Sequence, residues 1–156
     1  MLREVTLDTT RERSARSREH WTVLMLALLA PLGLAALGLV LHPDPRGYGT
    51  HEQLGFGPCL PMRLWNIPCP GCGVTTAVTL ALRGHVLASL RTQPFGLITI
   101  LACLACAGWT LATHLRRQDI WSEFQRWNWR LVWKVILVPA LLAWAYKLAL
   151  VRGWLG

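Results

Sequence analysis

Three long apolar stretches dominate the pattern of hydrophobic and polar positions along the chain. They cover residues 21–41, 95–115 and 131–151, and charged, Pro-rich or Gly-rich segments separate them. Helices that rise about 1.5 Å per residue cross a hydrocarbon core of about 30 Å at this length. The pattern therefore predicts an all-α membrane protein with three transmembrane helices.

Two lysines and a group of tryptophans accompany the third stretch. Lys134 and Lys147 stand near its ends, from where we expect their long side chains to snorkel to the lipid headgroups. Tryptophans at helix ends resemble the aromatic belts of membrane interfaces. They are Trp127, Trp129, Trp133, Trp144 and Trp154. Both features favour a membrane helix over 131–151.

A shorter apolar segment over 74–92 is interrupted in its middle. Arg83, Gly84 and His85 follow only nine mostly apolar residues. A charge at the centre of a bilayer costs at least about 2.5 kcal/mol on insertion scales. The sequence therefore predicts a re-entrant or interfacial helix pair here rather than a fourth span.

Composition assigns the remaining segments. Residues 1–20 form a polar N-terminal tail, and residues 21–156 form a single membrane domain with a Pro- and Gly-rich loop over 42–73. Residues 116–130 predict an amphipathic linker helix, for which Asp119 is a suitable N-cap. Its apolar face consists of Ile120, Trp121, Phe124, Trp127 and Leu131.

The distribution of charge indicates the partner surface and the orientation. The chain of 156 residues is 53% hydrophobic and has a net charge of +8. Its Arg and Lys residues mostly border the apolar stretches, which favours membrane lipids over nucleic acid as a partner. Five Arg residues lie in the tail and four in the 116–130 linker. The positive-inside rule places both on the cytoplasmic side, so the 42–73 loop faces outward.

The segment 68–75, PCPGCGVT, is the most distinctive part of this loop. Cys69 and Cys72 are three positions apart, so their thiols are expected to share one small volume, with Cys59 ten residues upstream. The glycines are expected to supply positive φ angles, and Pro70 limits the freedom of the turn. The frame of this knuckle consists of Pro70, Gly71, Gly73 and Thr75.

The knuckle resembles a family of small bacterial membrane proteins catalogued as a domain of unknown function. The residues that match its Cys-Pro-x-Cys-Gly-x-Thr-Arg signature and the surrounding pattern are Cys59, Cys69, Pro70, Cys72, Gly73, Thr75, Ala77, Leu82 and Gly84. Trp144, Tyr146 and Lys147 are similar to its C-terminal end. Thr76 replaces the Arg, and Gln93-Pro94 replaces an Asn-Pro. The resemblance implies a multi-pass protein of the bacterial inner membrane.

Three chemistries suit the clustered thiols. A zinc site needs about four ligands, and Cys59, Cys69 and Cys72 with His51 supply them, with His42 and His85 as other candidates for the fourth. A disulfide from Cys59 to Cys69 or Cys72 would staple the loop. Thiol redox chemistry suits the Cys-x-x-Cys spacing, although no thioredoxin-like pattern accompanies it. Cys103 and Cys106 repeat the spacing inside the second span, where we interpret them as packing residues.

Other catalytic groups are scarce. The sequence has no nucleophile elbow, P-loop, His-Glu-x-x-His or dinucleotide motif, which argues against an enzyme. Small residues on the first span, Gly33, Ala36 and Gly38, permit close helix contacts. The leading hypothesis is an accessory, assembly or structural subunit of a larger membrane complex. The alternative is a thiol-redox or metal-dependent membrane protein that uses the knuckle, with zinc as the candidate ion.

Overall fold

The computed structural model describes residues 18–154, and this part of the chain contains seven α-helices, one short 3₁₀ helix and no strand. The elements are α2 (Arg18–Val40), η1 (Thr50–Leu54), α3 (Leu60–Trp65), α4 (Val74–Leu82), α5 (Val86–Thr92), α6 (Pro94–Leu115), α7 (Ile120–Gln125) and α8 (Trp129–Val151). The predicted N-terminal tail lies almost entirely outside the described residues.

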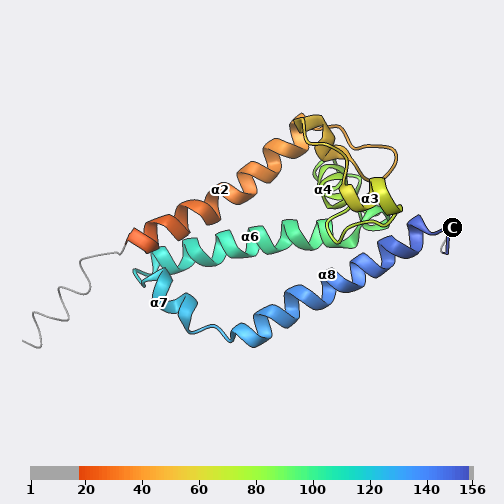
Figure 1. Ribbon diagram of the computed structural model, residues 1–156. Coiled ribbons are helices and arrows are strands. Elements are labelled where there is room, and N and C mark those ends of the chain that lie inside the picture. The colour runs from red at the N-terminus through yellow and green to blue at the C-terminus, as the bar shows by residue number, and fades with distance from the viewer. Residues whose placement is uncertain (1–17, 155–156) are drawn as a thin grey trace, which may run out of the picture.

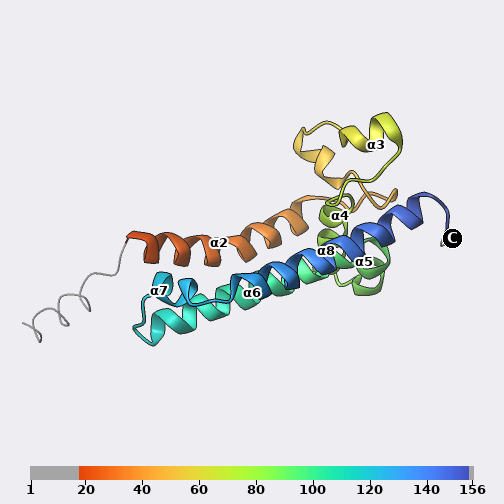
Figure 2. The same cartoon turned by 60° about the horizontal axis from the view of Figure 1, so that its bottom comes forward.

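The three predicted spans are confirmed as the three long helices. α2, α6 and α8 are each long and apolar enough to cross a membrane, and their ends lie within three residues of the predicted ones. They run alternately up and down the molecule, so the end of α2, the start of α6 and the end of α8 meet at one end (Figure 1). The η1, α3, α4 and α5 elements gather at this same end (Figure 2). We call it the loop end.

The interrupted segment forms two short helices that break at the predicted place. α4 packs against both α2 and α6, and α5 folds back on α4 and α6. The close approach is possible because two positions lack side chains: a Cβ on Gly38 of α2 would lie 2.5 Å from Leu82, and one on Gly96 of α6 would lie 2.5 Å from Ala77. Gly38 is therefore used within the chain rather than for a contact with another protein.

Arg83, which breaks this segment, has a structural role. Its guanidinium donates hydrogen bonds to the carbonyl oxygens of Gly38, Leu39 and Leu41, at 3.2, 3.3 and 2.9 Å. The last carbonyls of a helix have no partner within it, and a cation at this end also complements the helix dipole. The same charge that ends α4 thus stabilises the end of α2.

The linker helix is shorter than predicted. Asp119 caps α7 as expected, since its Oδ2 accepts from the Ser122 N–H at 3.0 Å. The helix ends at Gln125, however, because Asn128 starts a new helix and its side chain accepts from the Leu131 N–H. Leu131 therefore belongs to α8. A cluster of rings covers this end of the molecule: Trp109 lies 4.7 Å from Trp127 between ring centroids.

Candidate functional site

The cysteine knuckle consists of two consecutive turns that lead into α4. The Cys72 N–H donates to the Cys69 carbonyl at 2.9 Å, and the Val74 N–H donates to the Gly71 carbonyl at 3.1 Å. Gly73 has a φ of 87° and is the N-cap of α4. Gly71 does not adopt a positive φ, so the expectation that both glycines supply this conformation is wrong for Gly71. Gly73 alone makes the reversal that directs the chain into α4.

Cys59 reaches the knuckle from the preceding segment. It is the N-cap of α3, and its thiol is close enough to the thiol of Cys69 to affect it. Burial, followed by this contact, raises the pKa of Cys69. Burial and the proximity of Cys69 and Cys59 also raise the pKa of Cys72, to about 11. The structure thus brings the three predicted cysteines close to one another.

A cavity of about 190 Å³ opens beside two of these cysteines. It is lined by Arg46, Tyr48, Gly49, His51, Glu52, Pro58, Cys59, Met62, Arg63 and Cys72. His51 is therefore the histidine that shares this space with the thiols. The other two candidates lie elsewhere: His42 is exposed where its main chain bonds to Gln53, and His85 lines a separate, open hollow along α5.

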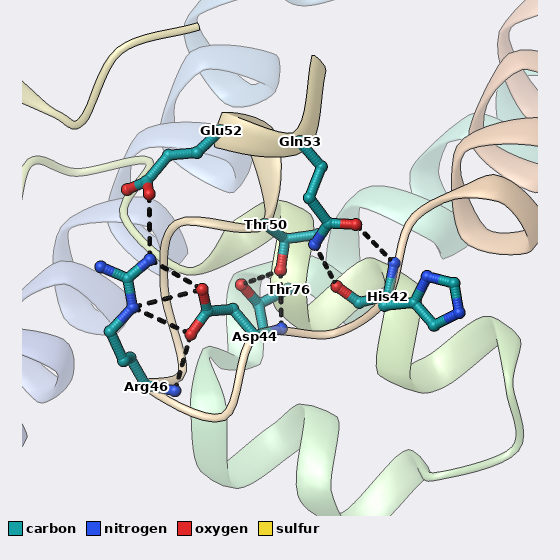
Figure 3. Close-up of polar contacts among 7 residues, drawn as sticks. All are labelled: His42, Asp44, Arg46, Thr50, Glu52, Gln53 and Thr76. Atoms are coloured by element: carbon teal, nitrogen blue, oxygen red, sulfur yellow. Dashed lines mark hydrogen bonds and ion pairs between the residues drawn. The ribbon is translucent and has the colours of Figure 1, made fainter. Parts of the chain in front are cut away.

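The wall that carries His51 is braced by a polar network (Figure 3). Arg46 binds Asp44 at 2.7 Å and Glu52 at 2.9 Å, and its hydrogen bonds lower the pKa of Asp44. The buried Thr50 hydroxyl accepts from the Asp44 N–H at 3.0 Å and lies 2.8 Å from the Thr76 hydroxyl. Because Thr76 belongs to α4, this contact attaches the η1 segment to the helix that follows the knuckle.

Helix α8 contacts both the loop over 42–73 and the end of α5. The Trp144 indole donates to the Pro68 carbonyl at 2.7 Å, and the Tyr146 hydroxyl donates to the Arg91 carbonyl at 2.9 Å. Lys147 donates to the carbonyls of Gly47, at 2.9 Å, and Thr92, at 3.2 Å. Lys147 is only 4% exposed, so the expectation that it snorkels to the headgroups is wrong. Its ammonium instead donates to the carbonyl of a loop residue and to that of the last residue of α5.

The thiols are free, and no preformed multi-ligand metal site is present in the described part of the chain. All five cysteines lack a disulfide partner. Between residues 18 and 154, no group of three or more His, Cys, Asp and Glu side chains is arranged to hold one ion. Cys103 is half-buried and Cys106 exposed on α6, and neither lines the cavity beside Cys59 and Cys72.

Comparison with known proteins places the knuckle in a recognised segment. Residues 59–107 match the family described as protein of unknown function (DUF2752). This match supports the resemblance found in the sequence. No curated protein and no solved structure matches the chain. The matched segment spans all three loop cysteines, α3, α4, α5 and the first part of α6, and it ends before α8.

Sequence reasoning missed the residues that fix the loop. Thr50 carried no motif signal, and Thr76 was noted only as a departure from the family signature. Trp144, Tyr146 and Lys147 were recognised by resemblance, but their role follows from the structure: each donates a hydrogen bond to a main-chain carbonyl between residues 47 and 92. The signal that could have found them is the presence of three side chains with hydrogen-bond donors on one turn of an otherwise apolar span.

Proposed function

We propose that this multi-pass helical protein binds a thiophilic metal ion at its loop end. The observation that carries the proposal is a cavity lined by Cys59, Cys72 and His51, with Cys69 next to both thiols. The candidate ligands are drawn from these three cysteines and His51, while Pro70, Gly71, Gly73 and Thr75 frame the knuckle. Loss of each thiol proton accompanies metal binding, because the thiolate is the ligand.

The raised pKa values of two of the thiols argue against nucleophilic thiol catalysis. A reactive cysteine has a lowered pKa, because the thiolate is the nucleophile. Here burial and neighbouring thiols raise the pKa of Cys69 and Cys72. The same crowding that disfavours several thiolates is relieved by a cation placed between them. A disulfide between two of the three thiols would relieve it as well, so the experiment must separate these outcomes.

Elemental analysis combined with thiol counting tests the proposal. The protein is purified in mild detergent under anaerobic conditions without chelators, and thiols are titrated after denaturation. We expect about one metal ion per chain and five free thiols. Cys59→Ser and Cys72→Ser, both on the cavity wall, are expected to lose the ion, while Cys106→Ser, on the exposed face of α6, retains it. Five free thiols without metal would overturn the proposal in favour of a simple turn. Three free thiols without metal would overturn it in favour of a disulfide.

An accessory role in a larger membrane complex is the second candidate, and one feature of the bundle favours it. Among the helices, α8 packs mainly on α6, and large apolar side chains point outward along it, including Leu141 at 56% exposed and Leu142 at 66%. Gly33 of α2 also has no atom near its missing Cβ. Lipid or a partner helix can cover such surfaces.

Affinity purification in mild detergent, followed by mass spectrometry, tests this second role. We expect the tagged chain to recover a stoichiometric membrane partner, and Gly33→Leu to reduce that recovery at unchanged expression. Gly108→Leu on α6 is the matched control, because it makes the same change at a second helical glycine whose added Cβ also meets open space. Recovery of the chain alone at a monomeric size would contradict the role.

The placement in the membrane is also part of the proposal. The N-terminal segment and the 116–130 linker lie on the cytoplasmic side, and the loop end faces outward from the bacterial inner membrane. The α4–α5 pair is then a re-entrant or interfacial element at the outer face, and α7 lies in the headgroup plane on the inner face. Support comes from the Arg-rich tail and linker and from the opposite ends at which α7 and α4 lie (Figure 1).

A further inference from the structure

The cavity beside the cysteines contains a donor that zinc sites do not use. Met62 lines the same cavity as Cys59 and Cys72. Met62 is the third residue of α3, whose N-cap is Cys59, so a short stretch of chain contributes both side chains to the cavity wall. Zinc in proteins takes thiolate, imidazole and carboxylate ligands, whereas thioethers together with thiolates select Cu(I).

The ligand arrangement also disfavours a four-coordinate ion. Structural zinc sites are almost always tetrahedral. In the chain from residue 18 to 154, no three His, Cys, Asp or Glu side chains surround one point. Cu(I) is satisfied by two or three soft donors. A pair of thiolates with one thioether, taken from Cys59, Cys72 and Met62, meets this lower requirement.

The charges around the thiols suit a complex with a net negative charge. Two thiolates and one Cu(I) carry a net charge of −1, whereas two thiolates and Zn²⁺ are neutral. Lys147 interacts electrostatically with Cys72, and Arg63 lines the cavity. Arg46 lines it too, but Asp44 and Glu52 bind its guanidinium. Nearby cations stabilise the anionic complex more than the neutral one.

We propose that the ion bound at the loop end is Cu(I), with Cys59 and Cys72 as thiolate ligands and Met62 as a thioether ligand. This inference rests on the metal-binding function proposed above and names its ion. As Cu(I) binds, the two thiols each release one proton to solvent, two Cu–S bonds to thiolate form, and no electron is transferred. Cys69 then remains as a neighbouring thiol.

Competition against a chromophoric Cu(I) chelator tests the inference on the full chain in detergent, under anaerobic and reducing conditions. We expect one Cu(I) per chain. Met62→Leu keeps an apolar side chain of similar volume. It is expected to weaken Cu(I) binding at least about tenfold, as loss of a metal-supporting group does elsewhere. Met25→Leu, on the exposed face of α2, is the control and is expected to leave the affinity unchanged.

A parallel titration with Zn²⁺ separates the two proposals. We expect Met62→Leu to leave Zn²⁺ affinity within about twofold, since zinc does not use the thioether. If Met62→Leu weakens neither ion, or weakens both equally, the thioether role is wrong while metal binding at the cysteines stands. If neither Cu(I) nor Zn²⁺ binds the unmodified chain, both proposals fail. Sulfur-only coordination in the X-ray absorption spectrum of the Cu(I) complex would support the ligand set directly.

Discussion

Gly73→Ala is expected to destabilise the protein by about 3 kcal/mol. An L-residue in the left-handed region costs about 1–2 kcal/mol, and Gly73 has a φ of 87°. The added Cβ would also lie 2.7 Å from the Gly47 carbonyl oxygen and 3.2 Å from the Lys147 ammonium. That oxygen is main chain and accepts from Lys147, so it cannot move without breaking the contact. Overpacking of this kind costs about 1–3 kcal/mol.

Chemical denaturation in detergent micelles, followed by circular dichroism, measures this loss. Gly71→Ala is the matched control, because Gly71 lies in the same knuckle, has no positive φ and has no atom within 4 Å of its missing Cβ. We expect this control to change the free energy of unfolding by less than about 0.5 kcal/mol. Equal effects of the two substitutions would contradict this prediction. They would show that Gly73 is not confined by its positive φ or by the nearby Gly47 carbonyl and Lys147 side chain.

Lys147→Met is expected to weaken the attachment of α8 to the loop end, with a loss of about 2 kcal/mol. Each hydrogen bond from a charged donor contributes about 1.5–3 kcal/mol, and Lys147 makes two such bonds, to Gly47 and Thr92. Removal of a buried charge returns part of this energy, because burial of the ammonium is itself costly. Methionine keeps the length of the side chain, so the loss reports the ammonium rather than a cavity.

The rate of maleimide labelling at Cys72 provides a local readout of the same change. Cys72 is buried, and Lys147 lies next to it. We expect Lys147→Met to increase labelling of Cys72 several-fold, in a background where the other four cysteines are replaced by Ser. Lys134→Met, an exposed lysine on the same helix, is the control and should leave labelling unchanged. Loss of the ammonium by itself raises the pKa of Cys72 and slows labelling, so an increase reports exposure of the thiol. The absence of any increase would contradict the anchoring role.

Local signals in the sequence were enough to locate the helices. The apolar stretches over 21–41, 95–115 and 131–151 became α2, α6 and α8, because length and hydropathy depend on neighbouring residues alone. The break after Leu82 and the cap at Asp119 were also predicted, since Arg-Gly and Asp act within a few residues. The linker helix was predicted too long, because the competing cap at Asn128 was overlooked.

The candidate site shows where local reasoning stops. Spacing alone brought Cys69 near Cys72, but the approach of Cys59 to Cys69 depends on the fold of the intervening α3. His51 was one of three histidine candidates, and only the tertiary structure places it on the cavity wall with the thiols. Met62 attracted no attention in the sequence, since a lone methionine in an apolar segment usually fills space.

By itself, the sequence determined the membrane class, the three long helices and the knuckle, because each follows from hydropathy or turn chemistry over a short window. Only the tertiary structure decided what the buried polar groups do. Lys147, placed near a helix end, points into the protein rather than to lipid, since the carbonyls of Gly47 and Thr92 lie within 3.2 Å of its ammonium. Arg83 caps the end of α2, 42 residues upstream, for the same reason: a main-chain carbonyl without a partner within its helix attracts whichever donor the fold brings to it.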